Sequence, residues 1–381
     1  MMDNKFDILL KNGRIIDPSQ NIDMIGDIAV NKKKIAYLGA PTQASAKKTY
    51  DMSGYIICPG LIDIHTHINY RGQANGMPVD LADIPYGVTY AFDAGSTGIS
   101  AYKALLQMLA NYDTRSKIAL NVSPIGLIMT TKVNEPVDPA LWDMDAFEEA
   151  IEYGQDRIWG FKIRISKNII GEQGLYPLEK TIELAEHYGK KVMIHATNPP
   201  EEMGTVAELL RPGDILSHIF HGTGLHLYAT GSIDRKIRDS QDRGVIMDVS
   251  PGQGNFSLAV AKRAIEDKFY PNTLSTDLNA SNWNNPMVFS LTAVMSKFMA
   301  LGMSLNDVIR TTTVTAAKAM QEVDLGTLKL GTTADITALK IIQKNALFFD
   351  KFNNTLYGDQ ILSAVMTIVN GKILYQSTET L

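Results

Sequence analysis

Two histidines, His65 and His67, end an apolar stretch that begins at Cys58. In a β-strand, residues i and i+2 lie on the same face, so both imidazoles should point the same way from a rigid element. Neutral imidazole is a common protein ligand for zinc and similar ions, and a pair of imidazoles needs one or two further ligands. The spacing therefore predicts a metal site whose other ligands come from elsewhere in the chain.

Four other polar residues are candidates for those ligands: Lys162 lies within a β-branched, apolar run, and His195, His218 and Asp277 each end one. A lysine inside a folded domain is costly when it is charged and unpaired. As a neutral amine it could react with carbon dioxide to give a carbamate, N6-carboxylysine, whose two oxygens could bridge two metal ions. Because the pKa of lysine is about 10.4 in model peptides, burial and metal binding would have to favour this reaction.

The elements that must position these residues follow a repeated pattern between residues 58 and 324. Short β-branched runs alternate with longer helix-like stretches, as in βα units around a parallel sheet. After the strand that ends in the histidine pair, the predicted strands are residues 87–93, 117–122, 158–165, 191–196, 214–220, 244–249 and 272–278. Eight such units predict an α/β fold of the (β/α)8 TIM barrel type, with the active site at the C-terminal ends of the strands. All the ligand candidates would then face one barrel mouth.

Both terminal segments read as β-strands with tight turns. Asn12-Gly13 and Asn370-Gly371 lie between apolar runs, which is the strongest short hairpin signal because both positions tolerate positive φ. Neither segment is long enough for a good β core alone. We therefore expect residues 1–57 and 325–381 to form one small β-sandwich domain beside a barrel domain of residues 58–324.

Composition excludes several other classes of protein. The net charge is −5 and there is no lysine- or arginine-rich run, so a nucleic-acid partner is not expected. One cysteine cannot form an intrachain disulfide. No apolar run approaches the roughly 20 residues that span a membrane, and the N-terminus lacks the apolar region of a signal peptide. We expect a cytoplasmic protein that acts on a small molecule.

The full set of motifs resembles the amidohydrolase superfamily, and most closely its dihydroorotase-like branch of binuclear metal hydrolases. The resemblance covers nearly the whole chain, including Pro-Gly-Leu-Ile-Asp at 59–63 and the segment 326–336. It implies that His65 and His67 hold one metal ion and that His195 and His218 hold the other. Carboxylated Lys162 would bridge the two ions, and Asp277 would bind the first ion and handle the proton. Homo-oligomerisation is expected from the resemblance alone.

The chemistry expected of this ligand set is hydrolysis. Two divalent ions that share a water molecule can present hydroxide at neutral pH, and one ion can polarise the carbonyl that the hydroxide attacks. Asp277 would accept the proton and pass it to the leaving group. Zinc is the expected ion, although manganese, iron or cobalt would also suit nitrogen and oxygen ligands.

The substrate is less closely defined by the sequence. Dihydroorotases resemble one another in an arginine two residues after the histidine pair, where this chain has Asn69. Arg71 and Arg164 are alternative groups for a carboxylate, because a guanidinium offers two parallel donors. Arg164 shares the strand face of Lys162, and Asn279 follows the last predicted strand. These four residues are the substrate-binding candidates.

The segments 87–96 and 214–222 look like a bacterial group of this branch, some of whose members cleave small acetyl esters or amides. The main hypothesis is therefore a deacetylase-like hydrolase of a small, carboxylate-bearing ester or amide. The alternatives are a cyclic amidase of the dihydroorotase or hydantoinase type, a deaminase, and a scaffold without catalysis. Among the remaining polar residues, Asp63 is expected to support the ligands from below, His187 to lie on the surface, and His221 to lie in a solvated loop or contact substrate.

Overall fold

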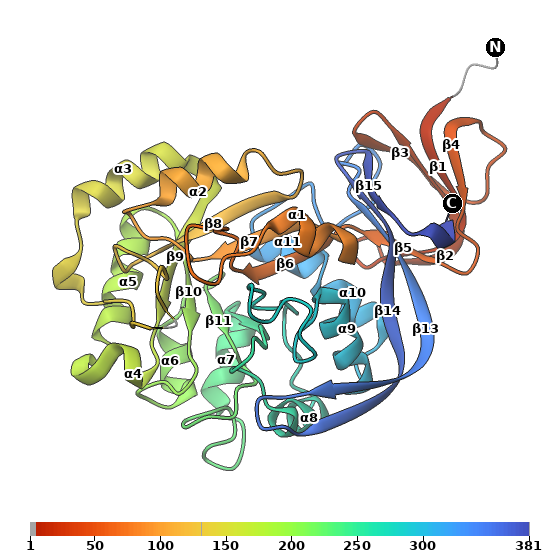
Figure 1. Cartoon of the computed structure of the whole chain (residues 1–381). Coiled ribbons are helices and arrows are strands. Elements are labelled where there is room, and N and C mark those ends of the chain that lie inside the picture. The colour runs from red at the N-terminus through yellow and green to blue at the C-terminus, as the bar shows by residue number, and fades with distance from the viewer. Residues whose placement is uncertain (1–4, 131, 381) are drawn as a thin grey trace.

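The computed structural model describes residues 5–130 and 132–380. In this part of the chain it contains a seven-stranded parallel sheet surrounded by helices and an eight-stranded mixed sheet beside it (Figure 1). None of the described helices is long and apolar enough to cross a membrane. The α/β class and the separate sheet built from both termini are confirmed.

The parallel sheet carries the predicted strands in sequence order. Each strand is paired with its neighbours in the chain, from β12 at one edge to β6 at the other. Its strands are β6 (Leu61–Thr66), β7 (Val88–Ala94), β8 (Arg115–Asn121), β9 (Ile158–Arg164), β10 (Lys191–His195), β11 (Ile215–Ser217) and β12 (Ile246–Asp248). Because all seven run parallel, their C-terminal ends meet at one end of the sheet, where the ligand candidates were predicted.

The eighth predicted strand, residues 272–278, differs from the prediction. This segment makes one parallel bridge to each edge of the sheet, Asp248 with Thr273 and Thr66 with Leu278, instead of a continuous ladder. The regular sheet is therefore a curled half-barrel and not a fully closed barrel. Side-chain bonds replace part of the ladder, since the Thr276 amide donates to Asp63 Oδ1 at 3.2 Å and its hydroxyl to Asp63 Oδ2 at 2.6 Å.

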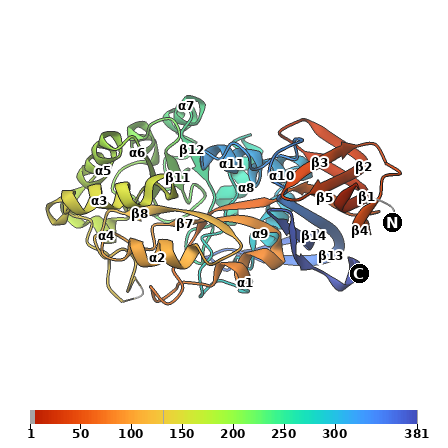
Figure 2. The same ribbon diagram turned by 90° about the horizontal axis from the view of Figure 1, so that it is seen from above.

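Helices cover the outside of the half-barrel, as the view from above shows (Figure 2). Several begin at a side-chain cap; for example, Asp143 and Ser290 accept bonds from backbone amides in the first turns of α3 and α9. The helices are α1 (Val79–Asp83), α2 (Tyr102–Leu109), α3 (Met144–Gly154), α4 (Lys167–Ile170), α5 (Tyr176–His187), α6 (Met203–Leu209), α7 (Arg235–Arg243), α8 (Leu258–Glu266), α9 (Leu291–Ala300), α10 (Leu305–Thr311) and α11 (Val314–Ala319). Short 3-10 turns lie at Ile84–Tyr86, Pro139–Leu141, Gln155–Arg157, Gly171–Gln173 and Thr378–Thr380.

The interior of the half-barrel is packed at its N-terminal end. Tyr90, Phe92 and Trp159 fill it together with apolar side chains of β6 and β10. Helix α11 closes this end, and the indole of Trp159 donates to the Ala319 carbonyl at 3.0 Å. The N-terminal end is therefore a packed floor, and open space is left at the opposite end of the strands.

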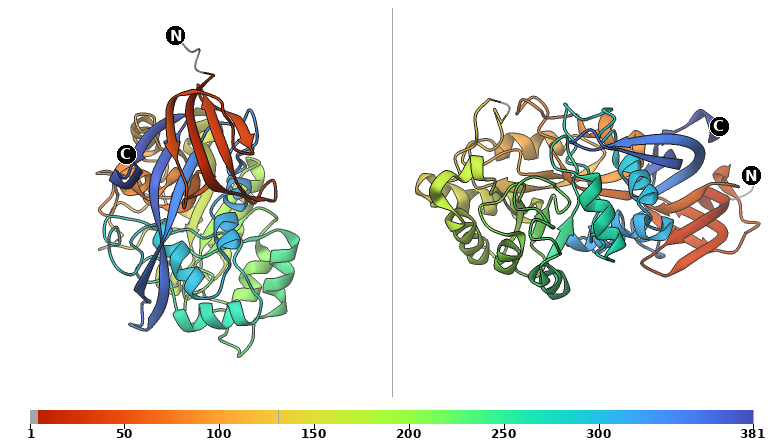
Figure 3. Two further views of the ribbon diagram at one scale, coloured as in Figure 1. Left: turned by 90° about the vertical axis from the view of Figure 1, so that its right-hand side faces the viewer. Right: turned by 90° about the horizontal axis from the view of Figure 1, so that it is seen from below.

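The mixed sheet joins the two ends of the chain (Figure 3). Strand β13 pairs with β5, and β5 pairs with β1, so the C-terminal hairpin continues the N-terminal strands. The strands are β1 (Phe6–Asp17), β2 (Ile22–Asn31), β3 (Lys34–Gly39), β4 (Ala46–Asp51), β5 (Ile56–Pro59), β13 (Ile336–Phe349), β14 (Thr355–Val369) and β15 (Lys372–Gln376). The pairing gives one mixed sheet, and the division into domains of residues 1–57 plus 325–381 and 58–324 stays a prediction.

Of the two Asn-Gly pairs that predict hairpin turns, one forms such a turn and the other does not. Asn370 and Gly371 turn between β14 and β15 with φ of 51° and 76°, as predicted. Asn12 and Gly13 instead lie inside β1, at a shift in its register with β2, so the predicted hairpin there is wrong. The Asn12 amide donates to Asp27 Oδ1 at 2.9 Å, and this contact accommodates a bulge in a continuous strand.

Candidate active site

A cavity of about 160 Å³ opens at the C-terminal ends of the parallel strands. Its wall combines strand ends with side chains from four of the loops that follow them. The lining residues are His65, His67, Gln73, Asn75, Leu127, Thr130, Lys162, Arg164, His195, Asn255, Asp277 and Asn279. Five of the six predicted metal ligands lie on this wall, and the sixth, His218, is buried beside it, with its ring 4.4 Å from that of His195.

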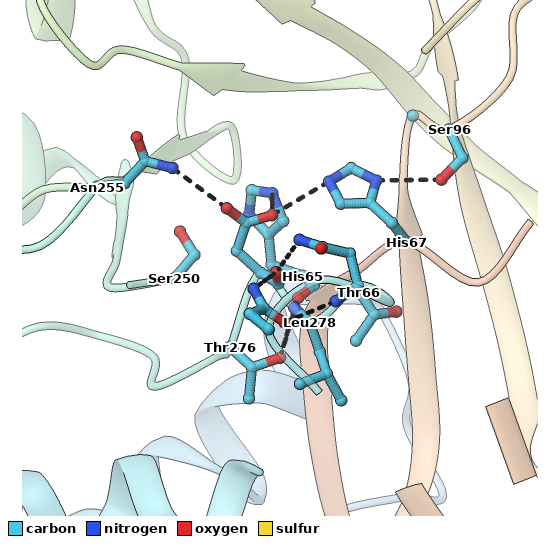
Figure 4. A network of polar contacts seen from close by, with 12 residues as sticks. His65, Thr66, His67, Ser96, Ser250, Asn255, Thr276 and Leu278 are labelled. Atoms are coloured by element: carbon cyan, nitrogen blue, oxygen red, sulfur yellow. Dashed lines mark hydrogen bonds and ion pairs between the residues drawn. The ribbon is translucent and has the colours of Figure 1, made fainter. Parts of the chain in front are cut away.

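The histidine pair faces Asp277 as the strand spacing predicts. His67 Nε2 lies 3.1 Å from Asp277 Oδ1, and His65 Nε2 lies 3.8 Å from the same oxygen. One ligand atom from each of the three residues lies within 4.8 Å of the others, and the group could hold a metal ion. The other ring nitrogen of His67, Nδ1, lies 3.0 Å from Ser96 Oγ, which fixes the orientation of the ring (Figure 4).

His218 follows β11 and is turned toward the same space. Its Nδ1 donates to the Ser250 carbonyl at 2.7 Å, which leaves a lone pair on Nε2. That Nε2 is buried, and the described residues offer it no hydrogen-bond partner. Burial lowers the pKa of His218 to about 3 and also lowers the pKa of His195, so both rings are neutral at physiological pH. Neutral imidazole is the form that binds a metal ion.

Lys162 lies on β9 with 1% of its surface exposed, and its Nζ is 3.3 Å from His65 Nε2. Burial lowers its pKa to about 7, although Asp277 and Asp248 partly oppose this. A substantial fraction of the amine is therefore neutral at pH 7, as carbamate formation requires. The chain makes room for this side chain with Gly95, where a Cβ atom would lie 2.4 Å from Lys162 Cβ.

Asp277 is the acidic group at the centre of the cavity. Burial raises its pKa, but the bond with His67 and the nearby His65 and His218 outweigh burial, so the net pKa lies below the usual aspartate range. Asn255 Nδ2 donates to the second oxygen, Oδ2, at 3.2 Å. In Figure 4 the side chains of His67 and Asn255 lie on opposite sides of the site, and their dashed lines point toward each other. Asp277 is therefore ionised and held in one orientation.

The donor set fits divalent metal ions. His65 Nδ1 and His218 Nε2 are buried ring nitrogens that have no hydrogen-bond partner among the described residues, and such groups are costly unless something else binds in the site. Neutral imidazoles, a carboxylate and an amine with a lowered pKa together provide nitrogen and oxygen ligands of the kind that zinc accepts. His65 Nδ1 lies 3.6 Å from Asp248 Oδ2, which is too far for a hydrogen bond, so this carboxylate lies behind the ring on the side away from the cavity.

The four predicted substrate-binding residues separate into two groups. Arg164 and Asn279 line the cavity, whereas Asn69 and Arg71 do not. Arg71 is exposed and places its guanidinium 5.2 Å from the ring centre of Tyr70, and Asn69 is buried beneath its own loop. The geometry therefore favours Arg164 and Asn279 for substrate contact, and the roles of all four stay predictions.

Sequence reasoning missed several residues that shape the site. Asn255, Ser250 and Glu135 lie on loops after strand ends, where no periodic pattern indicates which side chain turns inward. His221 was expected either in a solvated loop or in contact with substrate. Its side chain is fully buried, so the solvated alternative is wrong. Asp63 and His187 lie where they were predicted, the first below the ligands and the second on the surface.

A curled parallel sheet with histidines, a lysine and an aspartate at the C-terminal ends of its strands defines the class of barrel-type hydrolytic enzymes. The chain belongs to the amidohydrolase family, whose model matches residues 85–375. It is 27% identical over 372 residues to a protein of Enterococcus faecalis named deacetylase. The aligned region covers 97% of this chain and 99% of the relative.

Two solved structures are close to this fold over their whole length. One is titled as an adenine deaminase, with a TM-score of 0.90, 26% identity and coverage of 98% of this chain and 100% of the other. The second is titled as a dihydroorotase, with a TM-score of 0.89, 26% identity and coverage of 97% and 98%. The chain is therefore an enzyme of the amidohydrolase family, and the resemblance noted from its motifs is confirmed.

Proposed function

We propose that this enzyme is a binuclear metal-dependent hydrolase that removes an acyl group, with acetyl favoured, from a small ester or amide bearing a carboxylate. The observation that carries the proposal is the convergence of six potential ligands and one arginine around a single cavity. The name of the Enterococcus faecalis relative supports the deacetylase form of this proposal.

The metal ions would be held by the chain's own residues as the sequence predicted. His65 and His67 would hold one ion, His195 and His218 the other, and Asp277 would complete the first position. Lys162, once carboxylated, would contribute two oxygens between them. When bound, such ions supply Lewis-acid chemistry, lowering the pKa of water to about 7 and polarising a carbonyl.

The protein groups would handle the proton and orient the substrate. Asp277 is ionised and lines the cavity, so it can accept a proton from a nucleophilic water and return it to the leaving group. Asn255 holds the other oxygen of this carboxylate, which keeps the accepting oxygen in place during both transfers. The buried histidines stay neutral and do not compete for the proton.

Arg164 would bind the substrate carboxylate. It lies two residues after Lys162 on β9, so the two Cα atoms are separated by roughly 7 Å along one strand face. We favour a molecule whose carboxylate is close to the atom that carries the acyl group, because Arg164 and Lys162 leave the same strand face and line the same cavity. Acetylated 2-hydroxy acids and 2-amino acids have this arrangement.

A cyclic amidase is the second candidate, because a structure titled as a dihydroorotase has nearly the same fold. Ring opening would replace release of acetate in that case. A deaminase is the third, and the structure titled as an adenine deaminase keeps it open. Zinc as the ion, a cytoplasmic location and a homo-oligomer stay predictions.

The first experiment is metal analysis by plasma mass spectrometry on protein purified with bicarbonate and without chelator. The parent should contain about two ions per chain, and Lys162→Ala should lose at least one and reduce hydrolysis by more than about a hundredfold. Lys103→Ala is the matched control, because Lys103 is an exposed lysine of α2 paired with Glu149. Acetate release from acetylated hydroxy and amino acids then tests the substrate class. One ion or none in the parent would contradict the binuclear site.

A further inference from the structure

The only acidic partner of Arg164 among the described residues is a buried glutamate on a neighbouring loop. Glu135 is 3% exposed and lies between β8 and α3, and its Oε2 accepts a bond from Arg164 Nη1 at 3.3 Å. The other carboxylate oxygen, Oε1, is buried without a hydrogen-bond partner among the described residues. A buried carboxylate with half of its bonding capacity unused is costly, so this position needs a reason.

Arg164 is also only partly satisfied. Its side chain is 22% exposed and lines the cavity, while its Nε is buried and the described residues offer it no partner. A guanidinium has five N–H donors in a fixed plane, and the bond to Glu135 uses one of them. Donors therefore remain for a ligand, and Glu135 fixes the plane in which they lie.

The charges of this pair decide what the cavity attracts. Without Glu135, the arginine would present a full positive charge to an enclosed polar space, which favours anions strongly and with little selectivity. With Glu135 at 3.3 Å the charge is partly neutralised, but the donors that face the cavity are kept. Such a pair suits a singly charged, planar acceptor such as one carboxylate.

We propose that Glu135 is a specificity-determining positioning residue that orients Arg164 and reduces its charge, so that the cavity holds one substrate carboxylate in a fixed orientation without the strong attraction for anions that an unpaired arginine would exert. This inference rests on the proposed function, since it defines the substrate class of the same cavity. The loop that carries Glu135 also supplies Leu127 and Thr130 to the cavity wall. A purely structural role for Glu135 is therefore the competing explanation, and the test must separate the two.

The test measures binding of two probes that have no acyl group to lose, racemic lactate and racemic lactamide. They differ in carrying a carboxylate or a neutral carboxamide, and ligand-observed NMR titration gives both dissociation constants for the purified metal-containing protein. The variants are E135Q, E135D, R164M and the double variant E135Q/R164M. E208Q is the control, because Glu208 forms an exposed ion pair with Lys236 on the surface.

The parent should prefer lactate to lactamide, and R164M should lose this preference. E135Q keeps an oxygen that can accept from Arg164 and removes the negative charge, so its preference for lactate should rise roughly three- to tenfold. E135D keeps the charge but is one methylene shorter, so the preference should fall by about threefold as Arg164 loses its support. Adding E135Q to R164M should leave the preference unchanged, because Glu135 acts through Arg164.

The outcomes separate this inference from the proposed function. If acetylated acids are not hydrolysed but the lactate preference follows this pattern, the inference stands and the deacetylase proposal fails. If E135Q and E135D change the melting temperature but not the ratio of the two dissociation constants, the role is structural and the inference is wrong. A parent without preference for lactate also overturns it. If E135Q does not fold, the lactate preference of E135D still tests the inference.

Discussion

Two of the candidate ligands, His218 and Asp277, have positive backbone φ angles of 65° and 55°. Such angles cost L-residues other than glycine roughly 1 kcal/mol or more, and they persist where surrounding contacts enforce them. Here the Asp277 amide donates to the His65 carbonyl at 2.8 Å, and the His218 amide to Ser250 Oγ at 3.2 Å. The local strain turns both side chains inward, so stability is given up where the ligands converge.

Substitution of Gly95 tests how closely the backbone at this residue packs against the Lys162 side chain. At this glycine φ is +80°, and a Cβ would lie 2.4 Å from Lys162 Cβ. We expect Gly95→Ala to displace Lys162, to lower the metal content, and to destabilise the fold by about 2–4 kcal/mol. Metal analysis and urea unfolding measure both effects.

The control for this change is Gly54→Ala. Gly54 has almost the same φ, +84°, but, apart from its chain neighbours, the described residues place no atom within 4 Å of its Cβ position. It should cost about 1 kcal/mol through backbone strain alone and leave the metal content unchanged. Equal metal content in the two variants would show that Lys162 tolerates the added methyl group, contrary to this prediction.

At the scale of elements, the strands were predictable and the loops between them were not. The alternation of apolar and polar residues placed Lys162 on β9 and the histidine pair at the end of β6, within two or three residues of the observed bounds. The segment 272–278 lies where the eighth strand was predicted, but it forms single bridges with its neighbours and not a continuous ladder. Its pattern is that of a strand, and only the tertiary bonds to Asp63 show why pairing is interrupted.

Asn255 and Glu135 illustrate what the sequence could not provide. Both lie outside regular strands, and their bonds join segments that are 22 and 29 residues apart in sequence. A loop side chain has no periodicity that fixes its direction, so only the folded chain brings it to the cavity. The ligand set was predictable because strand ends meet at one place in this fold, whereas the groups that orient the ligands were not.

The long β13–β14 hairpin extends from the mixed sheet along one side of the barrel to α8, as Figure 1 shows. At its tip Asp350 is buried, and its carboxylate accepts bonds from the amides of Leu258 at 2.8 Å and of Phe352 and Asn354 at 2.9 Å. Asp350→Ala should lower the free energy of unfolding by about 2–3 kcal/mol, because three amides lose a charged acceptor.

Urea denaturation at pH 7 measures this loss. Asp359→Ala is the matched control, because Asp359 is an exposed aspartate on β14 of the same hairpin. The control should change the free energy of unfolding by less than about 0.5 kcal/mol. If the two variants had equal midpoints, Asp350 would not be anchoring the hairpin to α8.

The same hairpin is tied to α9 by a buried lysine whose titration gives a pH prediction. Lys297 Nζ donates to the carbonyls of Met287 at 2.7 Å and Phe349 at 3.1 Å. Burial lowers its pKa from 10.5 to about 8, although Asp350 opposes this. Below pH 8 both the folded and unfolded states hold the proton, so the cost of burying the charge is complete.

Between about pH 8 and 10.5 the folded state releases this proton before the unfolded state does. Stability should therefore rise with pH in this window, by up to about 3 kcal/mol from Lys297. The measurement is the difference in unfolding free energy between the parent and Lys297→Met at pH 8, 9 and 10. The parent should gain on the variant as the pH rises, and parallel curves would show that the lysine stays charged when folded.

At the scale of the whole molecule, the two sheets share both covalent and polar connections. Strand β5 leads within two residues into β6, so the mixed sheet continues directly into the barrel. An ion pair joins Arg115 of β8 to Asp335, and the Arg310 guanidinium donates to the Pro18 carbonyl at 3.3 Å. Because both terminal segments meet in one sheet, the barrel segment lies between the two halves of the smaller unit in sequence and beside it in space.

This arrangement predicts one cooperative unfolding transition for the two units. Unfolding the mixed sheet would remove the hairpin from α8 and α9 and expose apolar side chains of the core that they share. Hydrogen exchange with mass spectrometry along a urea series can follow peptides from β1 and β2 beside peptides from β9 and β10. Both pairs should lose protection at the same urea concentration, and Asp350→Ala should shift both midpoints together. Separate midpoints would mean that the units fold independently, and the barrel would then keep its metal site after the terminal strands had unfolded.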